Sequence, residues 1–234
     1  MKILCIADHI DPLVYSTGIK DRFRDIDFII SAGDLDLNYY GYIVSSLNKS
    51  LFFVFGNHNL KEISRFRREY SLDSEGNVPF GMLRRTYGST YIGDRVIKKN
   101  GLLIAGLGGS YSYNKGKNQY SEFQMALKIL HLLPPLVINR VFRKRWLDIL
   151  VTHAPVRGIN DREDLCHRGF KVFRLFLKIF KPMYHLHGHV HLYDLNAKRE
   201  IRFCQTTIIN VYESYILEVN LEDVKQHLYK SKGK

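Results

Sequence analysis

Five short apolar runs in this chain each end at a cluster of polar residues. The runs are ILCIA, FIISA, LFFVF, LDILVT and MYHLH. Apolar runs of this length, bounded by turn-forming residues, are typical of buried strands. Parallel strands deliver their C-terminal ends to one edge of a sheet, where ligands bind. We therefore expect the polar clusters, although far apart in sequence, to lie close together in space.

The rest of the pattern alternates between helix and strand. Helices are predicted over 41–48, 60–70, 121–133 and 169–180, and Pro134-Pro135 should end the third of them. Further strands are predicted over 90–97, 102–107, 147–152, 183–187, 201–210 and 213–219. The first two of these should form a hairpin, because Asn100-Gly101 is a strong turn signal. This alternation predicts an α/β fold with a mixed sheet.

The polar clusters at the strand ends supply carboxylate, amide and imidazole groups. Hard divalent metals prefer such ligands. The candidates are Asp8, Asp34, Asn57, His153, His189 and His191. Their placement predicts a metal centre at one edge of the fold.

The clusters resemble the motifs of the calcineurin-like metallophosphoesterase superfamily, which are D-x-H, G-D, G-N-H-[DE], H and G-H-x-H. The matching residues here are Asp8-His9-Ile10, Gly33-Asp34, Gly56-Asn57-His58-Asn59, His153 and Gly188-His189-Val190-His191. They follow the family's order over about four fifths of the chain, and each follows a predicted strand. The resemblance implies two stacked mixed β-sheets flanked by helices, an α/β/β/α sandwich. We expect a single domain over 1–224 and a basic C-terminal tail over 225–234.

The resemblance also implies a chemistry. The family's activity is hydrolysis of a phosphodiester, phosphomonoester or pyrophosphate by a metal-bound hydroxide, with one or two divalent ions of Mn, Fe or Zn. Asp34 would bridge the two ions. The second ion would take Asn57, His153 and His189, and the first would take Asp8 and His191. His58 would be the catalytic acid, because a histidine pKa lies near neutrality.

The chain departs from the family's motifs at two positions. Ile10 stands where D-x-H has its histidine, which leaves the first metal one ligand short. Asp11 is a candidate substitute, although an Asp before Pro12 is equally suited to capping a helix. Asn59 replaces the usual carboxylate after the catalytic histidine. A weaker first metal, or a single-metal enzyme, is the expected consequence.

Two further residues are candidates for contact with the substrate. His167 follows His153 in a loop and would touch the phosphate, and Ser110 ends a glycine-rich turn whose N–H groups could face an anion. An ordinary surface histidine and a plain turn are the competing interpretations. Cys166 is not expected to act as a nucleophile, and His185 and His187 are not expected to be ligands.

Composition limits the partners. The net charge of +12 indicates attraction to phosphorylated, nucleotide-like or lipid-linked substrates. Nucleic acid is possible but not favoured, because no aromatic and basic stacking platform is present. The basic, apolar segment 127–146 is either a lid over the site or an ordinary helical connection, while 170–181 is expected to pack on the core. The sequence does not set the oligomeric state.

Three widely spaced cysteines argue against a disulfide framework. No apolar run approaches the length of a membrane span, and the first strand begins at the N-terminus without a signal peptide. A cytoplasmic location is therefore expected. Two alternatives to the phosphohydrolase stay open: a non-catalytic interaction module on the same fold, and a metal-dependent nuclease.

Overall fold

The computed structural model describes all residues except 68–84, 195, 221, 223 and 225–234. Its helices are α1 (Ile19–Arg22), α2 (Leu37–Leu47), α3 (Glu122–Arg143) and α4 (Lys171–Phe180), with a 3₁₀ turn at Ile63–Arg65. The predicted tail 225–234 lies outside the described residues, as does the end of the predicted helix 60–70. The described part of 60–70 forms the 3₁₀ turn and no α-helix, so that prediction is wrong there.

The first sheet has the strand order β14-β1-β2-β3-β5-β4. Its strands are β1 (Lys2–Ala7), β2 (Phe28–Ser31), β3 (Leu51–Phe53), β4 (Arg85–Thr86), β5 (Ser89–Tyr91) and β14 (Glu213–Glu218). The four central strands are parallel, and β4 and β14 are antiparallel at the two edges.

The second sheet has the strand order β12-β13-β11-β10-β7-β6. Like the first sheet, it has four parallel strands at its centre. Its strands are β6 (Arg95–Lys99), β7 (Leu102–Leu107), β10 (Ile149–Thr152), β11 (Tyr184–His187), β12 (Glu200–Phe203) and β13 (Thr206–Asn210). Only β6 and β12, at the edges, are antiparallel to their neighbours. A separate pair, β8 (Ser110–Tyr111) with β9 (Gln119–Tyr120), lies before α3.

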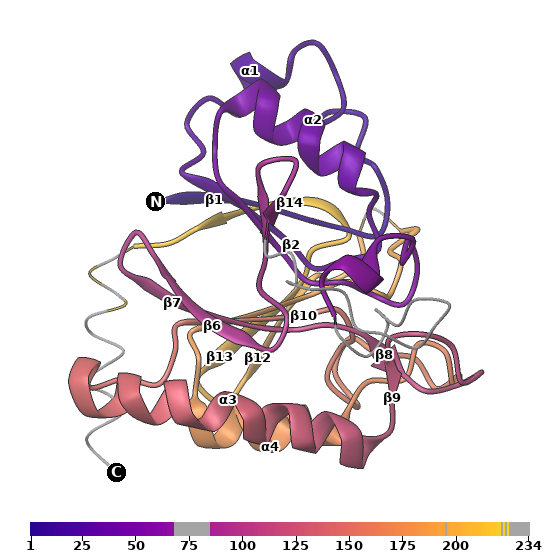
Figure 1. Ribbon diagram of the computed structural model, residues 1–234, viewed down its shortest axis with the longest axis vertical. Helices are drawn as coiled ribbons and strands as arrows, with labels where there is room; N and C mark the ends of the chain where they lie inside the picture. The colour runs from indigo at the N-terminus through magenta and orange to yellow at the C-terminus, as the bar shows by residue number, and fades with distance from the viewer. Residues whose placement is uncertain (68–84, 195, 221, 223, 225–234) are drawn as a thin grey trace.

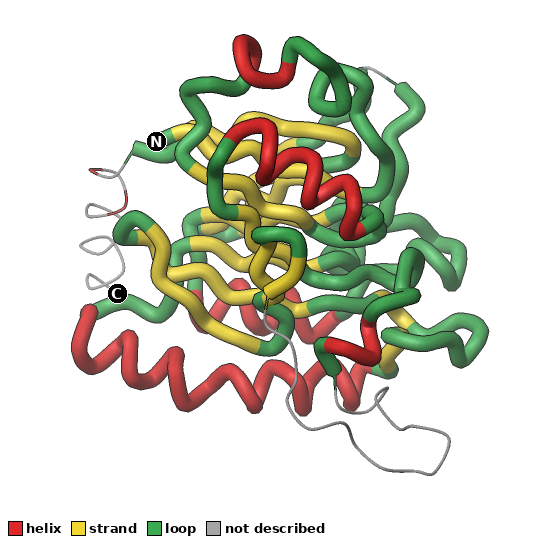
Figure 2. The backbone as a smooth tube through the Cα atoms, turned by 45° about the horizontal axis from the view of Figure 1, so that its top comes forward, coloured by secondary structure: helices red, strands yellow, loops and turns green. Residues whose placement is uncertain are grey.

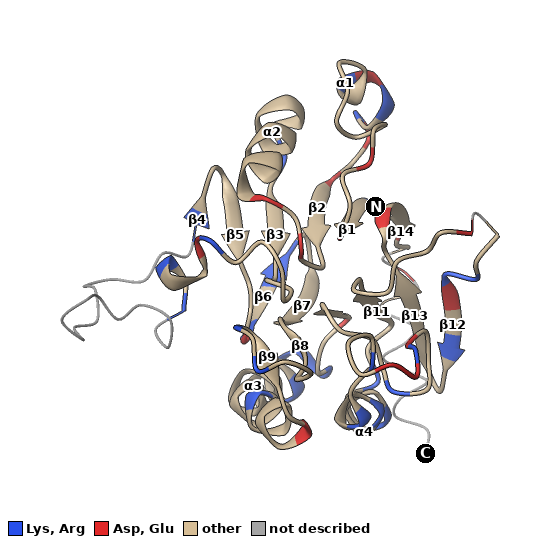
Figure 3. Ribbon diagram, turned by 90° about the vertical axis from the view of Figure 1, so that its right-hand side faces the viewer, with Lys and Arg blue, Asp and Glu red and all other residues tan. Residues whose placement is uncertain are grey.

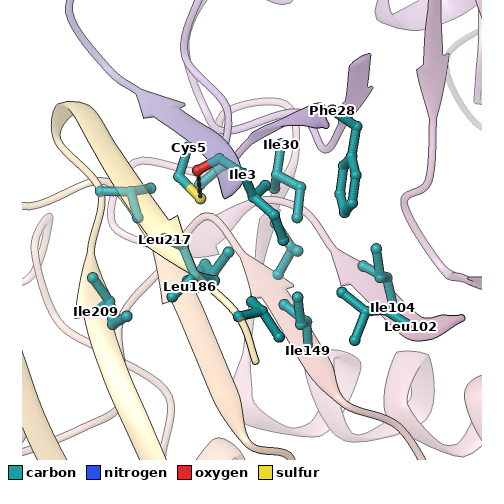
Figure 4. Close-up of a cluster of buried hydrophobic side chains, with 14 of the residues drawn as sticks. Ile3, Cys5, Phe28, Ile30, Leu102, Ile104, Ile149, Leu186, Ile209 and Leu217 are labelled. Carbon is teal, nitrogen blue, oxygen red and sulfur yellow. Dashed lines mark hydrogen bonds between the residues drawn. The ribbon is translucent and has the colours of Figure 1, made fainter. Parts of the chain in front are cut away.

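The two sheets stack face to face, with α1 and α2 covering the first and α3 and α4 covering the second (Figures 1 and 2). The faces between the sheets are almost wholly apolar. Ile3, Cys5 and Phe28 from the first sheet meet Ile104 and Ile149 from the second (Figure 4). Strands that are buried on both faces read as continuous apolar runs, which is why the sequence shows them so clearly. The predicted α/β/β/α sandwich is confirmed.

The predicted end of the third helix at Pro134 is wrong, because α3 continues through both prolines to Arg143. A proline removes the N–H that would bond to the carbonyl four residues earlier. Here those carbonyls belong to Leu130 and His131, which are exposed together with Pro134. Water can take the place of the missing donors, so the helix is not interrupted.

Two predicted strands are in fact pairs of strands. The run 90–97 divides at Gly93, so that β5 belongs to the first sheet and β6 to the second. The run 201–210 turns back at Cys204, whose φ of 54° is left-handed, and forms the hairpin β12–β13. The Asn100-Gly101 hairpin is confirmed: both residues have positive φ, and Lys99 pairs with Leu102.

A candidate metal centre at the strand ends

The polar clusters do converge at the C-terminal ends of the parallel strands. Asp8 follows β1, Asp34 follows β2 and His189 follows β11, and these three residues have φ values of 65°, 59° and 69°. Left-handed backbone is unfavourable for residues other than glycine, and such strain gathers at functional sites. Each residue turns the chain sharply at a strand end, so that its side chain remains at the edge shared by the two sheets.

The neighbouring glycines are needed mainly for space. Gly33 is the one with a left-handed backbone, with a φ of 105°. A Cβ on Gly56 would instead collide with the Asp34 carboxylate, and one on Gly188 would lie 2.5 Å from Oδ2 of Asp8. The absence of a side chain at these positions lets the carboxylates sit directly against the backbone.

His153 lies at the centre of the cluster and joins the two sheets. It follows β10 of the second sheet and is fully buried. Its Nδ1 lies 2.9 Å from the carbonyl of Ala32 in the first sheet. Its Nε2 lies 3.2 Å from Asp34 Oδ2, 3.1 Å from Asn57 Oδ1 and 3.0 Å from His189 Nδ1.

Four atoms face one another here, and together they have more lone pairs to share than hydrogens to donate. They are His153 Nε2, Asp34 Oδ2, Asn57 Oδ1 and His189 Nδ1. A carbonyl only accepts, so Nδ1 of His153 must donate to Ala32. Nε2 of His189 must likewise donate to the carbonyl of Cys166, which leaves its Nδ1 as an acceptor. The Asn57 amide donates from Nδ2 to Tyr113 Oη at 3.2 Å, so its oxygen faces inward. A single proton on His153 Nε2 could serve only one of three acceptors, whereas a cation would serve all of them.

The charges within the cluster shift its pKa values strongly. Burial alone would lower the pKa of His153, but the carboxylates of Asp34 and Asp8 outweigh burial and raise it to about 9. Burial raises the pKa of Asp8 to about 7, with Asp34 adding to the rise. Burial also lowers the pKa of His189 to about 3, and the charge on His153 adds to this effect. In the absence of a metal, the two carboxylates therefore favour a proton on His153.

Within the described chain, the buried group Asp34, His153 and His189 can hold a metal ion, because one donor atom from each lies within 4.8 Å of the others. Asp34 Oδ1 already accepts the backbone N–H of His58 at 2.8 Å, so Oδ2 is the oxygen that faces the histidines. Oxygen and nitrogen donors in this arrangement suit a divalent first-row metal.

The residues predicted for the first metal are placed differently. Asp8 is buried beside the cluster, 3.9 Å from His153 Nδ1, and both its oxygens accept the backbone N–H of His189. The imidazole of His191 lies against Tyr193 and Tyr212 and bonds to Tyr193 Oη at 3.2 Å. The structure thus brings Asp8 to the cluster and leaves His191 at its edge.

Asp11 uses both carboxylate oxygens within its own region. One accepts the N–H of Leu13 at 2.8 Å, as in a turn cap, and the other accepts the hydroxyl of Ser214. Asp11 therefore caps a turn rather than the helix expected after Pro12, because the first helix, α1, begins only at Ile19. Ile10 is 39% exposed, so the position where the family has a histidine opens to solvent.

His58 stands at the mouth of the cluster with an exposed side chain. Its backbone is fixed by the bond to Asp34, while its ring is free to meet a bound substrate. Asn59 does not act as a partner for that ring. Its Nδ2 donates instead to the carbonyl of Asp34 at 2.7 Å, which ties the loop to the end of β2.

The two candidates for substrate contact differ in position. His167 lies beside the cluster, with its ring 5.5 Å from that of His189, and its Nδ1 bonds to Asp164 at 2.8 Å. Ser110 is fully buried, and its hydroxyl donates to the carbonyl of Tyr111. Cys166 contributes its carbonyl rather than its thiol, because this carbonyl orients His189.

Three supporting residues were not anticipated from the sequence. Tyr113 orients Asn57. Asn118 is fully buried, and its Nδ2 donates to the carbonyls of Phe55 and Gly56 at 3.1 and 2.5 Å. Asn210 holds the loop after β11 through the Val190 carbonyl at 2.7 Å. Single amides and hydroxyls that bond to backbone carry no spacing signal, so only the folded chain reveals them.

His185 and His187 stay outside the cluster, as expected. Both are fully buried in β11. His185 Nε2 bonds to the Thr152 hydroxyl at 2.8 Å, and His187 Nδ1 bonds to the carbonyl of Gly188 at 3.0 Å. Burial lowers the pKa of His187 to about 4 and that of His185 well below its usual range, so both are neutral.

The family to which the chain belongs follows from comparison with known proteins. The family model of calcineurin-like phosphoesterases matches residues 1–193. The chain belongs to this family, whose members are phosphoester hydrolases and typically use divalent metals. No curated protein matches the chain.

Solved structures show the same fold at low sequence identity. One crystal structure is 15% identical, covers 97% of this chain and 96% of its own, and superposes with a TM-score of 0.61. The protein TT1561 of Thermus thermophilus is 13% identical, with coverage of 91% and 89% and a TM-score of 0.56. Phosphopantetheinyl hydrolase (PptH) from Mycobacterium tuberculosis is 13% identical, with coverage of 90% and 88% and a TM-score of 0.48. The shared fold rests on the first two structures, with TM-scores of 0.61 and 0.56, and these likenesses concern the fold alone.

Proposed function

We propose that this protein hydrolyses a phosphoester with a divalent metal held by Asp34, Asn57, His153 and His189. The observation that supports this proposal is the convergence of three acceptor atoms within 3.0–3.2 Å of His153 Nε2. Asp8 and His191 are the proposed ligands of a second, weaker ion. Manganese, iron and zinc all suit the mixed donor set.

In the proposed reaction, the protein's own groups would orient the metal ligands and protonate the leaving group. The carbonyls of Ala32 and Cys166 fix the ring orientations of His153 and His189, as carbonyl partners commonly do for histidine ligands. His58, exposed at the mouth, would donate a proton to the leaving alkoxide. When bound, the metal would neutralise phosphoryl charge and lower the pKa of water.

The substrate is proposed as a chemical class. The net charge of +12 and the family both favour a phosphorylated substrate, and we propose a nucleotide-like or lipid-linked ester, with phosphodiesters tested first. We also propose a cytoplasmic location, because Cys5, Cys166 and Cys204 are all unpaired.

The first test is hydrolysis of p-nitrophenyl phosphate and bis-p-nitrophenyl phosphate. Chelator-stripped protein is titrated with Mn²⁺, Fe²⁺, Zn²⁺ and Mg²⁺, and His58→Ala is the matched variant. We expect metal-restored turnover in the wild type and a loss of about 100-fold or more in the variant. Metal-dependent turnover unchanged in His58→Ala would overturn the role of His58.

A non-catalytic interaction module is the second candidate, favoured by Ile10 and by the position of His191 beside Tyr193. It predicts a folded protein that shows no turnover with any metal. Cleavage of single- and double-stranded DNA and RNA is assayed with the same metals. Cleavage of nucleic acid with no turnover of small esters would favour a nuclease instead.

A further inference from the structure

Helix α3 is apolar on two opposite faces. The face toward the second sheet buries Met125, Ile129, Leu132 and Leu136. The opposite face exposes large apolar side chains, which are 48–78% accessible to solvent. They are Phe123, Leu127, Leu130, Val137, Ile138, Val141 and Phe142. A helix that is apolar all round is normally enclosed on all sides, yet α3 is covered on one side only.

Helix α4 extends this exposed face. It lies beside α3 beneath the second sheet (Figures 1 and 3). It buries Phe173, Phe176, Leu177 and Phe180, and on its outer side Leu175 and Ile179 are 56% and 51% exposed. The nine exposed apolar residues of the two helices are called here the outer α3/α4 face. An apolar patch of this kind marks an interaction site.

The outer α3/α4 face is surrounded by positive charge. The sequence has no Asp or Glu from 123 to 147 or from 165 to 182, but these stretches hold ten Lys and Arg residues, of which Lys128 and Arg145 pair with Asp94 and Asp148. Figure 3 views both helices nearly end-on and shows blue segments on each, with red on α3 only near its start. That single acid, Glu122, is engaged, because its carboxylate accepts the N–H groups of Lys171 and Val172.

A small basic cavity lies at the C-terminal ends of the two helices. It has a volume of about 140 Å³ and is lined by Arg140, Lys144, Arg145, Trp146 and Lys181, with Asp148 as its only acid among the described residues. Exposed Ile179 also lines it and connects it to the outer α3/α4 face. A phosphate headgroup suits a cavity with this charge, while acyl chains suit the neighbouring apolar residues.

We propose that the outer α3/α4 face docks on the surface of an anionic lipid bilayer, with α3 lying in the plane of the interface. By length and composition alone α3 could cross a membrane, and only 28% of its most apolar stretch is buried. Its inner face, however, packs on the second sheet, so the helix lies along a surface rather than through it. A second copy of the chain is disfavoured as the occupant, because it would bring a second basic face against the first.

The test is sedimentation of the full-length protein with large unilamellar vesicles in the presence of chelator, so that no enzymatic activity is involved. Phosphatidylcholine vesicles are compared with vesicles in which about one lipid in three is phosphatidylglycerol. Leu127→Gln/Leu130→Gln removes apolar contact while keeping good helix formers. Its matched control is Tyr87→Asn/Ile216→Thr, which alters two exposed apolar residues away from these helices.

We expect binding to the anionic vesicles that weakens with salt, falls at least about 10-fold in the leucine variant and is unchanged in the control. Lys171→Gln/Lys178→Gln should reduce the preference for phosphatidylglycerol, whereas Lys20→Gln/Lys61→Gln should not. Absence of binding to anionic vesicles, or equal binding by the leucine variant, would overturn the proposal. Analytical ultracentrifugation showing a dimer that the leucine variant dissolves, without vesicle binding, would assign the face to a second copy instead.

Discussion

The two halves of the proposed metal centre are built to different degrees. In the half around Asp34, Asn57, His153 and His189, three ligand atoms lie 3.0–3.2 Å from His153 Nε2. In the half around Asp8 and His191, the carboxylate accepts a backbone N–H and the imidazole lies against tyrosines. The first half is pre-organised for a cation, and the second is not.

This difference shows how much a single ligand matters. Ile10 leaves a solvent-exposed apolar side chain where the family has an imidazole, and neighbouring Asp11 is engaged by Leu13 and Ser214. Besides the proposed bridge Asp34, only Asp8 and His191 would then hold the first ion. We therefore expect one tight metal ion and one weak ion, and the following experiments test this asymmetry.

The largest effect is expected from Asp34→Asn. The variant keeps an oxygen to accept the His58 N–H, but it loses the charge that faces the histidines. Turnover of bis-p-nitrophenyl phosphate should fall by about 1000-fold or more. Asp8→Asn is the comparison, and its loss should be at least about 10-fold smaller. Equal losses in the two variants, with thermal unfolding unchanged, would contradict the asymmetry.

Ile10→His should restore the weaker half. The position is 39% exposed, so an imidazole can be accommodated without disturbing the core. Metal analysis after gel filtration should rise from about one ion per chain to about two, with the second ion bound at least about 10-fold more tightly. Ile10→Gln is the matched control, because it is polar but a poor ligand. A stoichiometry of two ions in the wild type would show that Ile10 does not weaken the first site.

Tyr113→Phe should weaken the tighter half moderately. The hydroxyl accepts the Asn57 N–H at 3.2 Å and so turns the amide oxygen toward His153. Supporting bonds of this kind typically change metal affinity by about 10-fold, and titration with a competing chelator would measure the change. Tyr111→Phe is the control, since the Tyr111 ring packs on Phe170 and Arg168, while the Asn57 amide bonds to Tyr113. An unchanged affinity in Tyr113→Phe would show that Asn57 is oriented by other contacts.

Sequence reasoning was most successful where several constraints coincide. The strands before Asp8, Asp34 and His153 are continuous apolar runs because they are buried on both faces, and these runs placed the cluster at the sheet edge. Sequence reasoning failed where solvent or tertiary contact decides the outcome. Pro134 does not end α3, because the freed carbonyls belong to exposed residues that water can reach, and Asn118 holds the site through bonds to the backbone carbonyls of Phe55 and Gly56. For the segment 127–146, most of which lies in α3, the sequence left two interpretations open: a lid over the site or an ordinary helical connection.

The smallest effect expected is a pH dependence of stability in the metal-free protein. Burial lowers the pKa of His153, but the Asp34 and Asp8 charges outweigh it and raise the pKa to about 9. A raised histidine pKa stabilises the fold fully below its unfolded value of about 6.5, and this stabilisation is lost as the pH rises through 9. The thermal midpoint in chelator should therefore fall by about 5 °C between pH 6.5 and 9.

The Asp34→Asn variant tests whether His153 causes this pH dependence, because it removes the larger of the two charges that raise the His153 pKa. In the variant, the fall between pH 6.5 and 9 should shrink, since less stability depends on the bound proton. Saturating metal should remove the fall in the wild type, because the ion replaces the proton at Nε2. A midpoint that rises with pH in the chelated wild type would mean that His153 is neutral, and that the cluster is held together without its proton.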